Sequence, residues 1–328
     1  MTKPEFVRLA EHGALDARVE RAREILRSCA LCPRACGTDR VSGSLGYCGA
    51  GPEPRVYRHM SHPGEEPPIS GERGSGVVFF SHCTMSCSYC QNCRMSQEGA
   101  GVQRSAADLA AMMSALADAG CHNLNLVSAT QYVPAVLEAL LLAARAGVSL
   151  PVVWNTSGYE CALALELLDG VVDVYLADAR YAADQAAAKY SDAPDYVAVN
   201  RSALREMKRQ VGALELDDRG LARSGLIVRH LVLPNGVAGT EEVLGFVARE
   251  LGPGVAVSLM AQYYPAHRAA ALPEIARRIT PEEWAAAVRA LEASGIADGW
   301  VQEMPDTLSA VAGSEIEPDP NDLAGPPG

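Results

Sequence analysis

The stretch VVFFSHCTMSCSYCQNC, residues 77–93, decides the fold of this chain. It opens with the apolar run Val77 to Phe80 and continues into three cysteines, Cys83, Cys87 and Cys90, with the spacing CxxxCxxC. A strand that is buried on both faces reads as a continuous run of β-branched and aromatic residues. Because α/β folds place their sites beyond the carboxyl ends of parallel strands, we expect the three thiols at that edge of a parallel sheet.

Further apolar runs follow along the chain and are separated by stretches with helical patterns. The predicted strands span residues 124–127, 152–154, 171–176, 226–233 and 255–259, and the first predicted helices span residues 106–119 and 134–146. Strands that alternate with helices form a parallel sheet, closed or partly closed into a barrel, and about six βα units fit here. We therefore predict an α/β fold, a partial (β/α)6 barrel of the TIM type, over residues 76–303.

We expect a separate extension before the barrel, over residues 1–75. Its predicted parts are an amphipathic helix from Pro4 to Arg27, a cysteine-rich stretch from Cys29 to Cys48 and one short strand from Arg55 to His59. Glycine and proline are interleaved with these cysteines, which favours a metal-dependent knot.

The carboxyl-terminal part is predicted to hold one more helix and one more strand. A capping box starts the helix at Thr280, because Pro281 follows at the first helical position and Glu283 stands three residues after the cap. The pair Trp300–Val301 adds a final strand. Residues 304–328 are rich in Pro, Gly, Asp and Glu, so we predict a largely disordered tail.

The amino-acid composition and net charge limit the types of protein and partner that are possible. With 48% hydrophobic residues, the chain can bury a sizeable core. A net charge of −12 argues against nucleic acid or an anionic membrane as a general partner. The amino terminus is charged and has no signal-peptide pattern, so we expect a cytoplasmic protein. Thiols stay reduced there, and the ten cysteines are then metal ligands or core residues rather than disulfides.

The cysteine triplet has a specific chemistry. Three thiolates can bind three irons of a 4Fe-4S cluster and leave one iron open. The open iron can chelate the amino and carboxylate groups of S-adenosylmethionine and pass an electron to its sulfonium, which gives a 5'-deoxyadenosyl radical. The alternatives are a zinc knuckle completed by Cys93 and a group of buried thiols. A fourth thiolate would close the site, so we expect Cys93 not to be a ligand.

At these residues the sequence resembles the radical S-adenosylmethionine superfamily, and in particular its pyruvate formate-lyase-activating enzyme-like (PflX-like) branch. The resemblance runs from about Cys29 to beyond Tyr264. Besides the cysteine loop with YCQN at residues 89–92, it rests on the segments NLVSAT (125–130), NTSG (155–158), YLAD (175–178), RHLVLPN (229–235) and QYYP (262–265). The family implies a partial (β/α)6 barrel with the cluster in the first loop and S-adenosylmethionine across the carboxyl ends of the strands.

The resemblance also implies roles for residues near the cysteines. Tyr89 resembles the family's aromatic residue near the adenine, with an ordinary loop aromatic as the alternative. Ser128 and Thr130 stand where many members have Gly-Gly-Glu to hold the methionyl amino group. This chain has no carboxylate there, so the two hydroxyls or a backbone carbonyl are left to accept from that ammonium.

Three further strand-end residues are expected to bind the cofactor. Asn155 is suited to the methionyl carboxylate or the ribose, and capping the next helix is the alternative. Asp178 resembles the aspartate of an Asp-x-Lys motif, in which this chain has Arg180 in place of lysine. Arg229 is suited to pairing with a carboxylate, while His230 should point to the opposite face of its strand.

The cysteine-rich stretch supplies a second candidate metal site. Cys29, Cys32, Cys36 and Cys48 are enough to close a site around zinc or a 4Fe-4S cluster, and their spacing does not separate the two. Free thiols are the third alternative. The remaining Cys121 and Cys161 are predicted to be buried hydrophobic residues without a role.

Two classes of function are compatible with these patterns. The first is a radical enzyme that cleaves S-adenosylmethionine, draws electrons from a donor such as flavodoxin or ferredoxin, and acts on a glycyl-radical enzyme, another protein or a small molecule. The second is an iron–sulfur electron-transfer or metal-sensing protein that cleaves no cofactor. A methylating enzyme is a third class, which nothing in the sequence favours.

Overall fold

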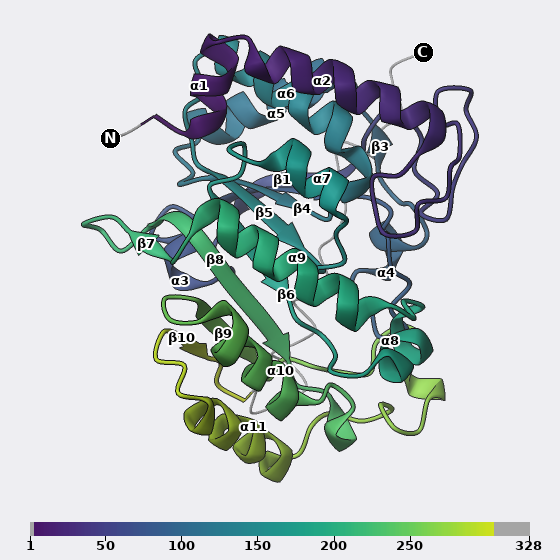
Figure 1. Ribbon diagram of the computed structural model, residues 1–328, viewed down its shortest axis with the longest axis vertical. Coiled ribbons are helices and arrows are strands. Elements are labelled where there is room, and N and C mark those ends of the chain that lie inside the picture. Colours follow the sequence, from purple (N-terminus) through teal and green to yellow (C-terminus); the bar gives the residue numbers. More distant parts are fainter. Residues whose placement is uncertain (1–2, 305–328) are drawn as a thin grey trace.

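The computed structural model describes residues 3–304, so the predicted tail lies outside the described residues except for its first position. The protein is an α/β structure built on a ten-stranded, mostly parallel sheet within this range (Figure 1). Its strands are β1 (Arg55–His62), β2 (Ser75–Phe80), β3 (Val102–Gln103), β4 (Leu124–Val127), β5 (Val152–Thr156), β6 (Val174–Asp178), β7 (Glu215–Leu216), β8 (Ala222–Leu231), β9 (Ala256–Met260) and β10 (Gly299–Val301).

The strand order is β10-β9-β8-β6-β5-β4-β2-β1-β3, with β7 attached to β8. Neighbours from β2 to β10 along this order are parallel, whereas β1 runs antiparallel to β2, and β3 antiparallel to β1. The order ends at β10 and β3 without closing, which is compatible with a partial barrel. Because β1 joins the sheet, part of the predicted extension borders the cavity described below.

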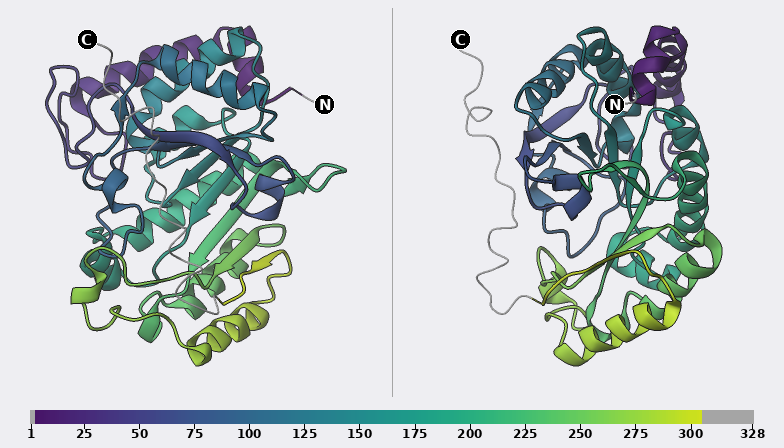
Figure 2. Two further views of the ribbon diagram at one scale, coloured as in Figure 1. Left: turned by 180° about the vertical axis from the view of Figure 1, so that it is seen from behind. Right: turned by 90° about the vertical axis from the view of Figure 1, so that its left-hand side faces the viewer.

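The helices connect the strands and cover the sheet (Figure 2). They are α1 (Glu5–Glu11), α2 (Ala14–Ile25), α3 (Pro67–Ser70), α4 (Cys93–Ser96), α5 (Ala106–Asp118), α6 (Val133–Arg145), α7 (Ala162–Leu168), α8 (Asp184–Ser191), α9 (Tyr196–Val211), α10 (Thr240–Phe246) and α11 (Pro281–Ser294). Short 3₁₀ turns span Leu26–Ser28, Thr130–Tyr132, Pro234–Gly236 and Ala269–Ala271, and Val247–Leu251 forms a π-helical turn. Among the described residues, no helix has the length and apolar character that crossing a bilayer requires.

Most of the predicted elements are confirmed, and one is wrong. The capping box is present, since the Thr280 hydroxyl accepts from the Glu283 amide and the Glu283 carboxylate accepts from the Thr280 amide. The predicted final strand is β10. The single helix predicted from Pro4 to Arg27 is instead two helices, α1 and α2. Gly13 separates them with a φ of 72°, a left-handed conformation that a helix interior does not accommodate.

Side chains alternate between the two faces of the sheet. Leu126 and Trp154 belong to the hydrophobic core that the strands share with the covering helices. Their chain neighbours Val127 and Asn155 line a cavity on the other face. Since successive strand residues point to opposite faces, one set of side chains packs against the helices while the alternate set, Val127 and Asn155 among them, faces the cavity.

Candidate functional site

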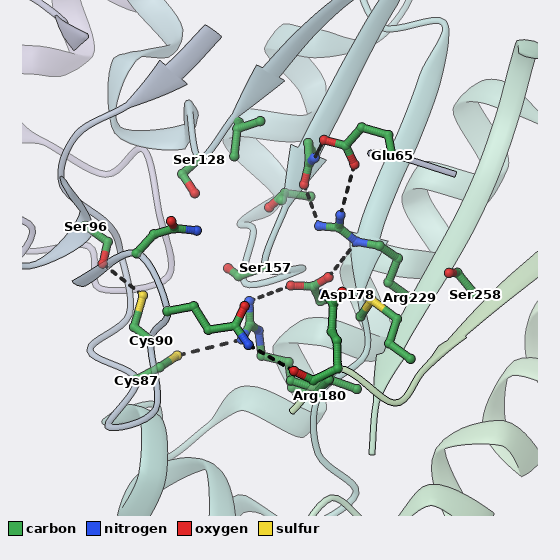
Figure 3. A pocket seen from close by; sticks show the side chains of 18 of the residues that line it. Glu65, Cys87, Cys90, Ser96, Ser128, Ser157, Asp178, Arg180, Arg229 and Ser258 are labelled. Carbon is green, nitrogen blue, oxygen red and sulfur yellow. Dashed lines mark hydrogen bonds and ion pairs between the residues drawn. The ribbon is translucent and has the colours of Figure 1, made fainter. Parts of the chain in front are cut away.

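A cavity of about 740 Å³ opens along the inner face of the sheet (Figure 3). This volume is in the range of small-molecule sites. Eight of the residues predicted for the main site line it, namely Cys83, Cys87, Tyr89, Cys90, Ser128, Asn155, Asp178 and Arg229. Tertiary folding therefore brings together residues that are spread over five separate segments of the chain.

The cysteine loop follows β2 and is held from two sides. The His82 amide donates to the Met95 carbonyl at 2.8 Å. On the other side, the amides of Ser86 and Ser88 donate to the carbonyls of Ser191 and Tyr190 at 3.1 and 2.7 Å, at the end of α8. These backbone bonds fix the loop beside the cavity, at the carboxyl end of β2.

The three thiols lie within electrostatic reach of one another. Burial, together with the neighbouring Cys87, raises the pKa of Cys83 to about 12 and that of Cys90 to about 11. Cys83 and Cys90 therefore stay protonated unless a cation favours their thiolates, as a bound metal does. In chemistry and position these donors fit a thiolate-bound cluster, although no three His, Cys, Asp or Glu side chains of residues 3–304 already meet around a metal-ion position.

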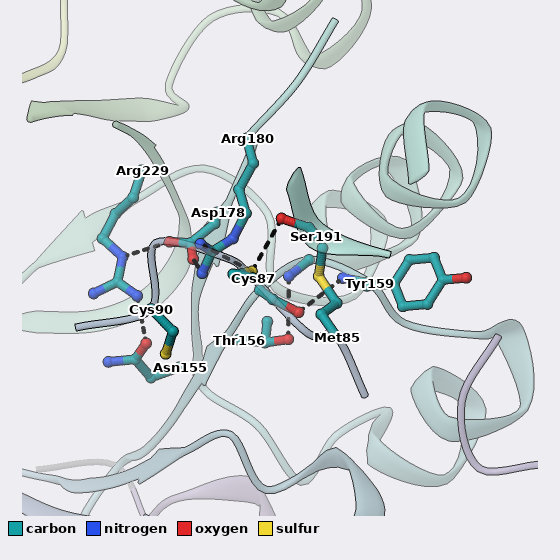
Figure 4. Close-up of polar contacts among 12 residues, drawn as sticks. Met85, Cys87, Cys90, Asn155, Thr156, Tyr159, Asp178, Arg180, Ser191 and Arg229 are labelled. Atoms are coloured by element: carbon teal, nitrogen blue, oxygen red, sulfur yellow. Dashed lines mark hydrogen bonds and ion pairs between the residues drawn. The ribbon is translucent and has the colours of Figure 1, made fainter. Parts of the chain in front are cut away.

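Hydrogen-bond donors approach the sulfur atoms (Figure 4). The Ser191 hydroxyl donates to Cys87 Sγ at 3.1 Å, and the Met85 amide donates to Cys83 Sγ at 3.4 Å. The Ser96 hydroxyl lies 3.1 Å from Cys90 Sγ. These donors are positioned to stabilise thiolates, and donors to ligand sulfurs are among the features that set cluster potentials.

A buried network of charges crosses the cavity. Asp178 accepts from Arg229 Nε at 3.0 Å and from Arg180 Nη2 at 2.5 Å. Arg229 Nη2 also donates to Asn155 Oδ1 at 2.5 Å. Burial opposes the charge of Arg180, but Asp178 and Cys87 hold its pKa well above the usual range. Arg180, which replaces the expected lysine, thus links Asp178 to Cys87, whose sulfur lies 3.9 Å from its Nη1.

Glu65 is a site residue that the sequence interpretation missed. It follows β1, lines the cavity, and accepts from the side-chain amides of Asn125 at 3.1 Å and Asn155 at 3.3 Å. Arg229 Nη1 lies 3.5 Å from its other oxygen. Burial raises the pKa of Glu65 to about 7 despite Arg229. The signal available in the sequence was the pair Glu65-Glu66 in the turn-rich passage that follows the strand predicted from Arg55 to His59.

Ser128 and Thr130 have different surroundings. Ser128 lines the cavity with a φ of 58°. The buried Thr130 hydroxyl instead donates to Glu160 Oε1 at 2.6 Å, and Thr156 and Trp154 donate to the same oxygen. Thr130 is not among the residues that line the cavity. The structure therefore does not bring this residue together with the cysteines.

Tyr89 belongs to a buried aromatic group. Its hydroxyl lies 2.6 Å from that of Tyr181, which in turn lies 2.7 Å from the Ser191 hydroxyl that donates to Cys87. The Tyr89 ring meets Tyr263 edge to face at 5.7 Å. Tyr89 is thus coupled to the Cys87 sulfur through a chain of hydroxyl groups.

His230 and Arg229 point to opposite faces of β8, as predicted. The buried His230 contacts the Ala179 carbonyl at 2.6 Å and the Thr240 hydroxyl at 2.9 Å, away from the cavity that Arg229 lines. Burial lowers the pKa of His230 to about 4, so the ring is neutral. Its contacts are those of a structural histidine.

The amino-terminal cysteines gather with a fifth cysteine. Burial raises the pKa of Cys32 to about 12, and Cys48, Cys29 and Cys161 add to the effect. The Cys161 thiol also donates to the Ala30 carbonyl at 3.4 Å. Tertiary packing thus places Cys161, which we predicted to be an isolated hydrophobic residue, against the knot.

Two other cysteines differ in their surroundings. Cys36 is exposed at the edge of the knot. Cys93 begins α4 and does not line the cavity.

Comparison with known proteins supports an iron–sulfur protein. Residues 69–191 match the family model of a 4Fe-4S single cluster domain, a span that includes Cys83, Cys87 and Cys90. The chain is also similar to an uncharacterized protein of Methanocaldococcus jannaschii, with 29% identity over 277 residues that cover 82% of this chain and 75% of the relative.

Proposed function

We propose that this chain is a radical S-adenosylmethionine enzyme in which Cys83, Cys87 and Cys90 hold a 4Fe-4S cluster. The observation that carries the proposal is the position of three thiols, all on one loop, at the edge of a cavity that Asn155, Asp178 and Arg229 also line. The matched 4Fe-4S domain supports the kind of cofactor. Three ligands leave one iron for a further molecule, which favours catalysis over simple electron storage.

The cluster would supply an electron that splits the sulfonium of S-adenosylmethionine into methionine and a 5'-deoxyadenosyl radical. The chain's own residues would bind and orient. Ser128 and Asn155 offer hydroxyl and amide groups to the methionyl end or the ribose, and Asp178 offers a carboxylate already oriented by two guanidinium groups. Tyr89 lies beside the cysteines, where an aromatic face can contact the adenine.

The protein environment would also tune the electron transfer. Ser191 and Ser96 contact two of the sulfur atoms, and Arg180 brings a positive charge to Cys87. Each of these groups stabilises the more negative, reduced state. They therefore ease acceptance of an electron from a donor such as flavodoxin or ferredoxin, both of which we propose as partner types.

Hydrogen abstraction by the radical would complete the reaction. A glycine of a partner enzyme, another protein or a small molecule is the candidate substrate. We further propose that Cys29, Cys32, Cys36 and Cys48 bind a second metal, either zinc or a cluster, outside the cavity. Iron, sulfide and zinc analysis of reconstituted protein with and without Cys29→Ala and Cys32→Ala tests that second site.

The decisive experiment measures 5'-deoxyadenosine. Protein reconstituted and reduced under anaerobic conditions is incubated with S-adenosylmethionine, and the products are separated by chromatography. The wild type should form 5'-deoxyadenosine and Cys87→Ala should form none. Cys121→Ala is the matched control, because Cys121 is also buried but lies outside the cavity, and it should behave as the wild type. A reducible cluster without product in the wild type would indicate an electron-transfer protein instead.

A further inference from the structure

The end of the cavity far from the cysteines is closed by the turn between β1 and α3, which contains Glu65 and Glu66. β1 is antiparallel to β2, and His62 pairs with Ser75, so this turn lies at the amino end of β2. The cysteine loop follows the other end of the same strand. Six residues of strand separate the two ends by roughly 17 Å. Figure 3 shows Glu65 beyond Arg229 and Asp178 as seen from Cys87 and Cys90.

Carboxyl groups outnumber guanidinium groups in the cavity lining. Asp178, Glu65 and Glu66 supply three carboxylates to the cavity lining, and Arg180 and Arg229 supply two guanidinium groups. Both guanidinium groups bind Asp178, and Arg229 alone also reaches Glu65. No guanidinium of the lining lies within ion-pair distance of Glu66, although, against the opposing effect of burial, Asp178 and then Glu66 raise the pKa of Arg229.

Glu66 is a buried acceptor without a donor. It is only 8% exposed, and its Oε2 has no hydrogen-bond partner among the described residues. The side-chain amide nitrogen of Asn125 donates to Glu65, while its Oδ1 is a second buried acceptor without a hydrogen-bond donor among the described residues. A buried carboxylate oxygen without a donor is costly, and such groups in native proteins call for an explanation. A ligand that brings hydrogen-bond donors and a positive charge satisfies Glu66.

Apolar side chains of the cavity lining suit an alkyl stem. Phe79, on the strand that joins the cysteine loop to the closed end, lines the cavity, as do Leu231 and Met260 at the carboxyl ends of β8 and β9. These apolar side chains can contact a hydrocarbon chain while its charged end lies at the turn. A carboxylate at the same position would be repelled by the Glu66 carboxylate.

We propose that Glu66 binds the primary ammonium group of an alkylamine substrate, whose stem extends toward the cysteines. The inference rests on the proposed function. An ammonium group bound at the closed end would place the carbons of the alkyl stem near a radical formed at the cysteine end of the cavity. The interaction is a charge-assisted hydrogen bond to a buried carboxylate, which is about twice as strong as a neutral one. Glu66 would thus determine which substrates the cavity accepts.

Calorimetric titration of the reconstituted protein with small probes tests this site. n-Butylammonium should bind at least tenfold more tightly than butan-1-ol, a difference of about 1.4 kcal/mol, and butyrate should bind worst. Glu66→Gln preserves the shape of the side chain and should remove the preference for the ammonium. Glu24→Gln, an exposed substitution on α2, is the matched control and should keep it. Equal binding of the amine and the alcohol to the wild type would overturn the proposal, whether or not Glu66→Gln folds.

Two further measurements extend this test. One distinguishes a protein lysine from a small-molecule amine, and the other distinguishes failure of this inference from failure of the proposed function. A capped Gly-Lys-Gly peptide that binds as well as n-butylammonium indicates a lysine of a protein substrate, whereas binding of n-butylammonium alone indicates a small molecule. Unchanged amine binding in Glu66→Gln refutes the inference. 5'-Deoxyadenosine is assayed without any amine, so absence of that product together with Glu66-dependent amine binding refutes only the radical chemistry.

Discussion

Replacing Glu65 by Gln should change how the stability of this protein depends on pH. The Glu65 carboxyl has a pKa of about 7 in the folded chain, against the ordinary value of 4.5 that it has in the unfolded chain. The main cause is its burial. The folded state therefore binds the proton more tightly than the unfolded state. The stability that this provides is fully present below pH 4.5 and is lost as the pH rises through 7.

The full effect is about 3 kcal/mol, at 1.4 kcal/mol for each unit by which the two pKa values differ. Between pH 5.5 and pH 8, about 2 kcal/mol of it falls within reach of experiment. Gln cannot titrate and keeps the size of the protonated side chain. The free energy of unfolding of the wild type should therefore fall by about 2 kcal/mol relative to that of Glu65→Gln over this range.

Urea unfolding of the metal-free wild type, Glu65→Gln and the exposed control Glu24→Gln at pH 5.5 and pH 8, followed by circular dichroism, measures this difference. The free energy of unfolding of the control should change between the two pH values by the same amount as that of the wild type. If the free energies of wild type and Glu65→Gln also change by equal amounts, Glu65 is ionised at both pH values and the buried acidic end of the cavity is wrongly described. Such equal changes would show that Arg229 dominates over burial.

Three further predictions concern other parts of the site. Ser191→Ala removes the donor to Cys87 Sγ and should lower the cluster's reduction potential by about 40 mV, the equivalent of a hydrogen bond of about 1 kcal/mol. A redox titration followed by electron paramagnetic resonance measures this potential. An unchanged potential would show that the hydrogen bond does not affect it. Thr130→Val takes one donor from the buried Glu160 and should destabilise the fold by about 1–3 kcal/mol while binding of S-adenosylmethionine stays intact, and weakened binding at unchanged stability would contradict this reading. Gly158→Ala should lower the thermal stability more than Gly147→Ala does. Both glycines have positive φ values, 71° and 92°, but a Cβ at Gly158 would lie 2.3 Å from the Asp178 carbonyl oxygen, whereas one at Gly147 meets nothing within 4 Å. Equal losses of stability would mean that backbone strain alone matters.

Much of the fold could be predicted from the sequence because it depends on local patterns. The apolar run before Cys83 is β2, and the Thr280 capping box starts α11. Strand alternation separated Arg229 from His230. Each of these features is set by residues within a few positions of one another. The helix break at Gly13 was missed because a helical pattern on both sides hides a change of direction.

Contacts between distant segments were decided only by the tertiary structure. Glu65 reaches Asn155 because β1 adds to the sheet beside β2, a pairing that no local pattern specifies. Thr130 turns toward Glu160, and Cys161 toward the amino-terminal cysteines, because buried polar groups must find partners within the assembled core. The sequence by itself determined which strand carries the cysteine loop and which residue types surround it. The register and packing of the sheet determined which charges share the cavity, because these depend on contacts between residues far apart in the chain.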